Sequence, residues 1–142
     1  MPRIHVPTEL RRLVIERALG CCEYCLIHQD YTDFSHQVDH IIAIKHRGLT
    51  VLINLALACL ECNLLKGSDL TSIDPLTGEI IPLFNPRWQN WREHFTFQAE
   101  MIVGLTPTGR TTTSLLQFNR SDRAGQRRYL IKLGVYPPQS IV

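Results

Sequence analysis

The chain carries CEYC at residues 22–25 and CLEC at residues 59–62, two Cys-x-x-Cys pairs. In each pair the two-residue spacer forms a tight turn that brings both thiolates to one ion, and two such pairs supply the four sulfur ligands of a tetrahedral structural zinc site. The pairs therefore predict a zinc ion that joins two segments distant in the sequence. The predicted ligands are Cys22, Cys25, Cys59 and Cys62.

Other interpretations of the cysteines are less favoured. Reduced cysteines can simply be buried thiols, but their grouping into two tight pairs favours a metal. An iron–sulfur cluster is a weaker alternative still. Cys21 is the odd cysteine, and its three-residue spacer to Cys25 makes it a poorer ligand than Cys22. We expect Cys21 to be a buried thiol.

Length and composition favour one domain in a reducing compartment. The 142 residues include 44% apolar residues, which is enough for a single core. No stretch approaches the roughly 18 apolar residues that a membrane span needs. Residues 1–5, MPRIH, lack the apolar core of a signal peptide. We therefore expect a soluble, cytoplasmic protein whose cysteines stay reduced.

Positive charge is concentrated near the C-terminus. Residues 110–132 hold six basic residues and one acid, a net charge of +5, whereas the remainder carries −3. Such a segment is a candidate phosphate-binding surface, although a solvated helix face is an equally good explanation of the composition.

Apolar periodicity and turn residues predict a mixed set of helices and strands. Thr8 is the expected N-cap of the first helix and Gly20 its C-cap. The turn formers between residues 68 and 86 predict little regular structure there. Trp88 and Trp91 are expected in the core. The predicted helices are 9–19, 59–66, 112–119 and 121–133, and the predicted strands are 38–44, 55–58 and 95–103.

The residues between and after the cysteine pairs resemble the HNH nuclease family. The resemblance extends over residues 22–69, with VDHII at 38–42, Asn54-Leu55, and Asn63 directly after the second pair. One departure is at residues 45–48, KHRG, where two glycines are common in the family and only Gly48 is present. A further block, LFNPR at residues 83–87, is similar to one in small stand-alone bacterial members.

The resemblance implies an α+β fold with a small ββα-metal core, zinc knuckles and flanking helices. We expect residues 1–142 to form a single HNH nuclease domain. Its core would span residues 20–70, and residues 83–142 would form a C-terminal extension with strands and basic helices.

The family's chemistry assigns a role to each motif residue. Phosphodiester cleavage needs a positioned, deprotonated water and neutralisation of the departing oxygen. By resemblance His40 is the general base, because a largely neutral imidazole accepts a proton at cellular pH. Asn54 matches the position that orients this base. Neighbours on a regular strand point to opposite faces, so the strand should bulge or end where Asp39 and His40 must share a site.

A catalytic divalent cation, separate from the structural zinc, is also implied. Asp39 and Asn63 match its ligand positions, and their hard oxygen atoms suit magnesium or manganese. Lys66, one helical turn beyond Asn63, and His46 are candidates for substrate binding. His36 and His94 are expected to be structural.

These features together predict an endonuclease that hydrolyses DNA phosphodiester bonds. DNA is the expected partner, no membrane association is expected, and the oligomeric state is left open. The alternative is a non-catalytic zinc-stabilised module that binds nucleic acid or protein.

Overall fold

The computed structural model describes residues 5–141. Residues 1–4 lie outside the described residues. They include most of residues 1–5, the segment from which we predicted that there is no signal peptide. Within residues 5–141, no helix is long and apolar enough to cross a membrane.

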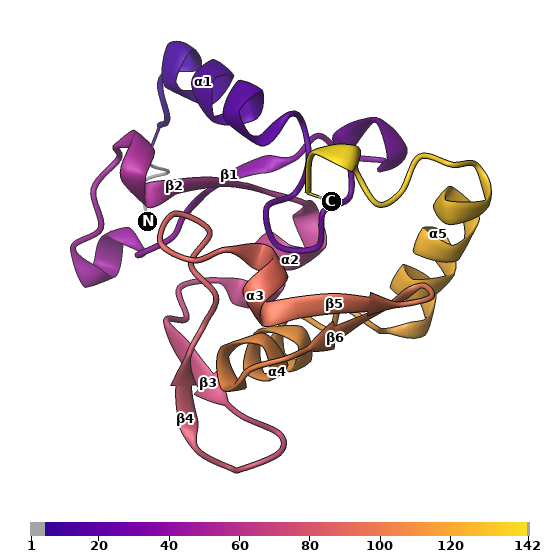
Figure 1. The fold of residues 1–142 in the computed structure, drawn as a ribbon. Helices are drawn as coiled ribbons and strands as arrows, with labels where there is room; N and C mark the ends of the chain where they lie inside the picture. Colours follow the sequence, from indigo (N-terminus) through magenta and orange to yellow (C-terminus); the bar gives the residue numbers. More distant parts are fainter. Residues whose placement is uncertain (1–4, 142) are drawn as a thin grey trace.

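Helices and three small antiparallel sheets make up an α+β fold, as predicted (Figure 1). Each sheet has two strands, and the pairs are β1–β2, β3–β4 and β5–β6. The elements are α1 (Thr8–Ala18), β1 (Gln37–His40), β2 (Leu55–Ala58), α2 (Leu60–Lys66), β3 (Thr71–Ile73), β4 (Ile80–Pro82), α3 (Trp91–His94), β5 (Phe95–Gln98), β6 (Met101–Gly104), α4 (Pro107–Leu115) and α5 (Ser121–Lys132), with 3-10 turns η1 (Gln29–Tyr31), η2 (Ile44–His46), η3 (Leu52–Asn54) and η4 (Gln139–Ile141).

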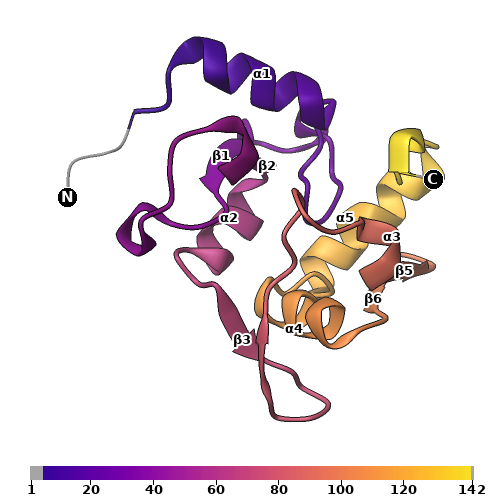
Figure 2. The same ribbon diagram turned by 60° about the vertical axis from the view of Figure 1, so that its left-hand side comes forward.

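Strand β2 is buried on both faces because different elements cover it. Leu55 and Leu57 form a small apolar cluster with Val14 of α1. The alternate residues, Ala56 and Ala58, belong to the main core on the other face. Side chains along a strand alternate between faces, so the sequence LALA places its leucines against α1 and its alanines against the core. Figure 2 shows α1 lying across this unit.

Strand β1 is shorter than the predicted strand 38–44. It pairs with β2 from Gln37, opposite Ala58, to His40, opposite Leu55. Beyond that point the side chain of Asn54 takes the backbone N–H of Ile42 at 2.9 Å. Ile41 still donates its backbone N–H to the Asn54 carbonyl at 2.9 Å, but at Ile42 a side-chain amide replaces the backbone partner. The strand therefore ends at His40, as predicted.

The C-terminal half packs directly on the first cysteine knuckle. Trp91 donates its indole N–H to the Tyr24 carbonyl at 2.8 Å, and the Tyr136 hydroxyl donates to the Cys25 carbonyl at 2.7 Å. Phe95 lies in the same buried cluster as the cysteines. The core and the extension therefore share one hydrophobic interior.

Helix α1 is one of several elements whose boundaries or type differ from the predictions. It begins at Thr8, which therefore is not its cap, and Leu19 takes the left-handed conformation that closes it (φ 54°).

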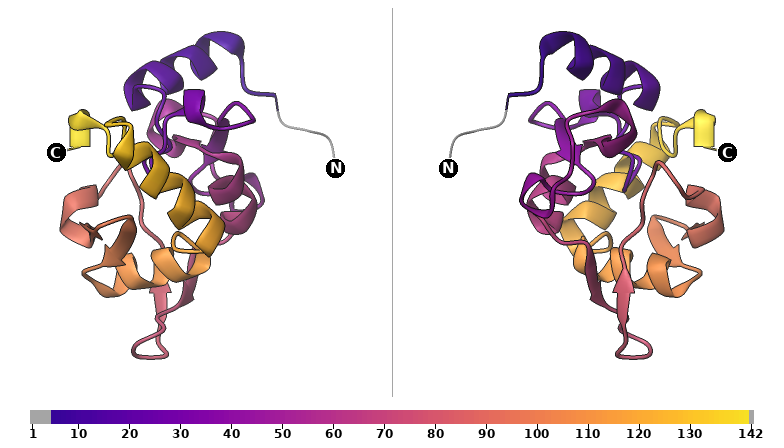
Figure 3. Two further views of the ribbon diagram at one scale, coloured as in Figure 1. Left: turned by 90° about the vertical axis from the view of Figure 1, so that its right-hand side faces the viewer. Right: turned by 90° about the vertical axis from the view of Figure 1, so that its left-hand side faces the viewer.

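The segment 68–86 contains the β3–β4 hairpin, which projects from the body (Figure 3). Residues 95–104 form a hairpin rather than one strand, because the chain turns at Ala99 (φ 53°). The predicted helix 112–119 lies earlier, at 107–115. Trp91 is in the core as expected, but Trp88 is 71% exposed.

Predictions for the central elements and the last helix agree with the structure. Strand β2 has the predicted bounds, and α2 starts one residue after Cys59 and ends before Gly67. Helix α5 matches the predicted helix to within one residue.

Candidate active site and metal centre

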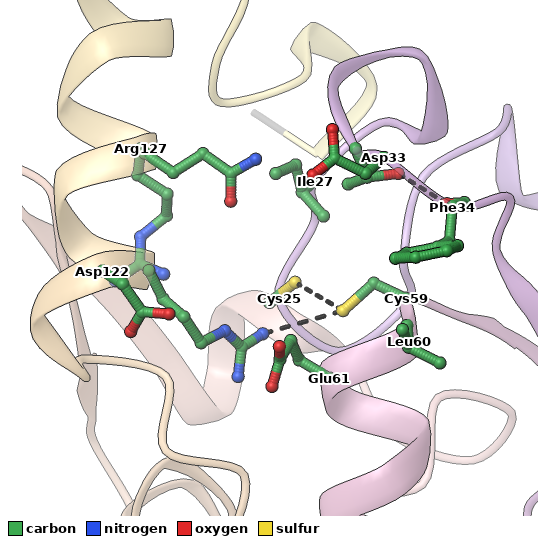
Figure 4. A pocket seen from close by; sticks show the side chains of 12 residues that line it. Cys25, Ile27, Asp33, Phe34, Cys59, Leu60, Glu61, Asp122 and Arg127 are labelled. Carbon is green, nitrogen blue, oxygen red and sulfur yellow. Dashed lines mark hydrogen bonds between the residues drawn. The ribbon is translucent and has the colours of Figure 1, made fainter.

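The four predicted zinc ligands converge. Their sulfur atoms all lie within 4.8 Å of one another, and all four side chains are buried. Sulfur atoms on a tetrahedral zinc are about 3.8 Å apart when each Zn–S bond is about 2.3 Å. The Cys25 and Cys59 sulfurs are 3.7 Å apart, close to this separation (Figure 4). The predicted ligands are Cys22, Cys25, Cys59 and Cys62.

Both knuckles are shaped by backbone N–H groups that point at sulfur. The Cys25 N–H donates to the Cys22 sulfur and the Cys62 N–H to the Cys59 sulfur, each at 3.4 Å. Cys59 is also the N-cap of α2. The metal site therefore fixes the start of the helix that carries Asn63.

Arg123 of α5 reaches the cysteine cluster. Its guanidinium lies 3.1 Å from the Cys62 sulfur and 3.7 Å from the Cys59 sulfur, and it also donates to the Leu116 carbonyl. The side chain is buried. If the cluster holds zinc through four thiolates, the site would carry a net charge of −2, and this guanidinium would offset part of that charge.

Most of the basic side chains of the C-terminal segment bind other groups of the protein. Arg110 pairs with Asp74, Arg120 with Glu61 and Asp122, and Arg128 with Glu100. Arg127 is buried and donates to the Glu100 carbonyl. Most of these side chains already bind protein groups, and a phosphate-binding role for the segment stays a prediction.

Asp39 is held in the interior by two partners. Its Oδ2 accepts a hydrogen bond from the Tyr24 hydroxyl at 2.8 Å and lies 3.2 Å from Nζ of Lys66. Burial raises the pKa of Asp39, while Lys66 and Tyr24 act in the opposite direction. Both Asp39 and Lys66 are almost fully buried.

The position of Lys66 differs from the one expected of a phosphate contact. Its side chain is only 3% exposed, and its ammonium also donates to the carbonyls of His40 (3.3 Å) and Ile41 (3.1 Å). Because these groups satisfy the ammonium, Lys66 neutralises Asp39 and anchors the end of β1 to α2 instead of facing a substrate.

The His40 ring is partly exposed and is positioned by Thr50. Its Nε2 lies 2.9 Å from the Thr50 hydroxyl. Burial lowers the pKa of His40, Asp39 raises it, and Lys66 lowers it, with a net decrease. The ring is therefore neutral near pH 7.

Asn54 acts on the loop rather than on the ring. Its amide oxygen accepts from the Ile42 N–H at 2.9 Å, and its amide nitrogen donates to the carbonyls of Ile42 (3.0 Å) and Leu49 (2.9 Å). The direct contact with His40 expected from the sequence is replaced by an indirect one. Asn54 closes the loop that contains Thr50, and Thr50 contacts the ring.

Asn63 and His46 remain available to outside groups. Asn63 lies on α2, one turn before Lys66, and its side chain forms no hydrogen bond within residues 5–141. His46 is exposed on η2.

The remaining histidines and the fifth cysteine have the expected placements. His36 is buried and bonds through Nε2 to the Ile27 carbonyl, and His94 contacts the Thr106 hydroxyl. Cys21 is buried and lies outside the four-sulfur cluster.

Sequence reasoning missed three residues that shape the site. Tyr24 carried a usable signal, since it lies between two ligands of the first knuckle. Thr50 and Arg123 carried none, because their contacts join residues 10 and 61 positions apart that only tertiary packing brings together.

Comparison with known proteins agrees with this geometry. Residues 22–69 match the family model of the HNH endonucleases. The matched segment contains both cysteine pairs together with Asp39, His40 and Asn54. Residues 22–69, about a third of the chain, are thus similar to the core of the HNH endonucleases. No curated protein and no solved structure gave a significant match.

Proposed function

We propose that the protein is a metal-dependent endonuclease that hydrolyses DNA phosphodiester bonds, with His40 as the general base. The observation that carries this proposal is the placement of His40 at the end of β1, inside the HNH match and next to Asp39. The match to the HNH family supports nuclease-type chemistry, and we assign the roles of the particular residues.

The free nitrogen of His40 is the proposed base. Thr50 engages Nε2, and Nδ1 has no hydrogen-bond partner within the described part of the chain. When the ring proton is on Nε2, the Nε2–H donates a hydrogen bond to the Thr50 hydroxyl. Nδ1 then keeps a lone pair that can accept a proton from water. The lowered pKa of His40 keeps that lone pair available at neutral pH.

Asp39 and Asn63 are the proposed ligands of a catalytic magnesium or manganese ion. Carboxylate and amide oxygens are suitable hard donors. When bound, the cation would neutralise negative charge on the scissile phosphate and leaving oxygen. Apart from the four cysteines, residues 5–141 hold no group of three or more His, Cys, Asp or Glu side chains that could bind a metal. Water and substrate oxygens would have to complete the coordination.

Lys66 sets a condition on this cation site. Its ammonium lies 3.2 Å from the same carboxylate oxygen that Tyr24 contacts. A cation at Asp39 must therefore share the carboxylate with Lys66 or displace its ammonium. We assign Lys66 to charge balance at Asp39, and His46 to contact with the substrate.

A plasmid-nicking assay tests the proposal. The zinc-loaded protein should nick supercoiled plasmid when magnesium or manganese is added, and His40→Ala should reduce the rate by about 10² to 10⁴. His28→Gln is a matched control, because that ring contacts Asp30 outside the proposed site. Full activity of His40→Ala would exclude this base. DNA binding by the parent without nicking under either metal would favour the alternative, a non-catalytic binding module.

A further inference from the structure

The β1–β2 loop (residues 41–54) exposes an unusual amount of apolar surface. Leu49 and Ile53 are 67% and 69% exposed, and five of the ten residues from 44 to 53 are large exposed hydrophobics. Single exposed apolar residues are ordinary, but a concentration of them marks an interaction site. The five are Ile44, Leu49, Val51, Leu52 and Ile53.

The same loop is positively charged and contains no acidic residue. Lys45, His46 and Arg47 are consecutive and exposed. Neither Lys45 nor Arg47 forms an ion pair with any described residue, in contrast to the arginines of the C-terminal segment. An apolar surface bordered by unpaired cations fits a polyanion with an apolar interior, which describes a nucleic acid duplex better than an acidic protein surface.

The loop is rigid although it is exposed. Asn54 joins Ile42 to Leu49 from within, and Arg17 of α1 donates to the Leu52 carbonyl at 2.8 Å. Gly48 packs so closely that an added Cβ would lie 1.6 Å from the Ile42 carbonyl oxygen. A preorganised loop loses little conformational entropy on binding. Its apolar side chains therefore contact a ligand without a large ordering cost.

The loop also contacts the proposed base. Leu49 immediately precedes Thr50, whose hydroxyl lies 2.9 Å from His40. In Figure 1 the loop forms the edge of the molecule opposite α5. A ligand bound over Leu49 would therefore lie beside the proposed catalytic centre.

We infer that the β1–β2 loop is a DNA wedge, in which Leu49 enters between neighbouring bases while Lys45 and Arg47 hold the flanking phosphates. Proteins that insert an apolar side chain into a base step unstack that step and bend the duplex. The inference rests on the proposed function and adds a substrate class to it. Duplexes that unstack easily, such as those with a mismatch or an abasic site, are the preferred substrates.

Binding measurements without cleavage test the wedge. The zinc-loaded protein, without added magnesium or manganese, is titrated with one duplex sequence in fully paired, single-mismatch and abasic forms. The parent should bind the two defective duplexes about tenfold more tightly, because part of the unstacking cost is already met. A 2-aminopurine base beside the defect should brighten on binding as it loses its stacking partner.

Two kinds of variant separate the wedge from the phosphate contacts. Leu49→Ala should abolish the preference for defective duplexes and the 2-aminopurine signal. Lys45→Gln and Arg47→Gln should each weaken binding to all three duplexes by the same factor. Each should also reduce the salt dependence of the binding constant by about one released counterion. Leu76→Ala, at a position 72% exposed between β3 and β4, is the matched control and should change neither property. Zinc content and thermal unfolding show that each variant is folded.

The outcomes distinguish this inference from the proposed function. A Leu49→Ala variant that keeps the preference, or a parent that binds all three duplexes equally, would overturn the wedge and leave the nuclease proposal standing. A parent that binds no duplex would overturn the wedge, and plasmid nicking with added metal then decides the nuclease proposal separately. If Leu49→Ala instead converts a dimer into a monomer on size-exclusion chromatography, the loop is an interface between copies of the chain and the wedge is refuted.

Discussion

The Tyr24 hydroxyl lies 2.8 Å from Oδ2 of Asp39, so a residue inside the first cysteine knuckle holds the carboxylate of the proposed catalytic site. Tyr24 is fully buried, and its backbone carbonyl accepts from the Trp91 indole. The structural metal site and the proposed catalytic site are therefore joined by one side chain. Through this contact, a metal held by the cysteine cluster would also orient a carboxylate that is not one of its ligands.

Tyr24→Phe should weaken the proposed cation site and leave the zinc site intact. The variant loses a hydrogen bond to a charged group, which contributes about 1.5 to 3 kcal/mol to stability. A carboxylate without this partner should also bind the cation more weakly, and we expect the magnesium concentration for half-maximal nicking to rise about tenfold. Tyr136→Phe is the control, because it loses only a hydrogen bond to the Cys25 carbonyl. An equal magnesium effect in both variants would contradict the assignment.

Lys66→Met should destabilise the protein strongly. Removing the ammonium leaves Asp39 as a buried charge without its ionic partner, and such changes cost about 3 to 5 kcal/mol. Adding Asp39→Asn to Lys66→Met should restore much of the loss, since no uncompensated charge then remains. Denaturant unfolding of the two single variants and the double variant measures this coupling. Additive effects would mean that the ion pair has no role in stability.

Gly48→Ala should disturb the β1–β2 loop without releasing zinc. The added Cβ would collide with the Ile42 carbonyl, so the loop must shift and carry Thr50 away from His40. We expect faster amide exchange across residues 42–54 and a reduced nicking rate. Gly125→Ala is the control in α5, where an added Cβ meets nothing within 4 Å. There the same substitution should stabilise the protein by about 0.5 to 1 kcal/mol, because alanine favours a helix.

Cys59→Ser should release zinc and unfold the protein, whereas His40→Ala should leave zinc content and melting temperature almost unchanged. Apparent zinc-binding free energies of about 10 to 16 kcal/mol in small zinc-binding peptides are comparable with the whole stability of a domain of this size. Metal analysis and thermal unfolding of both variants make the comparison. Loss of zinc in both would show that the two metal sites are not separate.

Arg123→Gln should make zinc easier to remove. The guanidinium contacts the Cys62 and Cys59 sulfurs, and its loss leaves the negative charge of the site less balanced. Cys25, Cys59 and Arg123 itself line a pocket beside the cluster, so loss of the guanidinium would open this side to a chelator. We expect zinc transfer to a coloured chelator to accelerate about tenfold, as is common when a residue supporting a metal ligand is lost. Arg128→Gln, which removes only an exposed pair with Glu100, should not change the rate.

Local patterns accounted for the elements around the metal. Cysteine spacing predicted the cluster of four sulfurs that could hold a metal ion, because a two-residue spacer brings two sulfurs together. The bounds of β2 and α2 followed from an apolar run, a capping cysteine and a terminal glycine. Boundaries failed at β1 and at residues 95–104. There the outcome depended on a side chain from Asn54 and on a turn at Ala99, neither of which has a signature in the pattern.

The sequence by itself determined the four-cysteine cluster, the motif order and the α+β class. These depend on spacing along the chain, which packing does not alter. Tertiary structure alone decided the partners of the proposed catalytic residues: Lys66 turned inward to Asp39, Asn54 bound the loop instead of the ring, and Thr50 met His40. Except for the bond from Asn54 to Leu49, these contacts join residues 10 or more positions apart. A side chain's partner at that separation depends on which groups the completed core leaves unsatisfied, and that is settled only when the whole chain has packed.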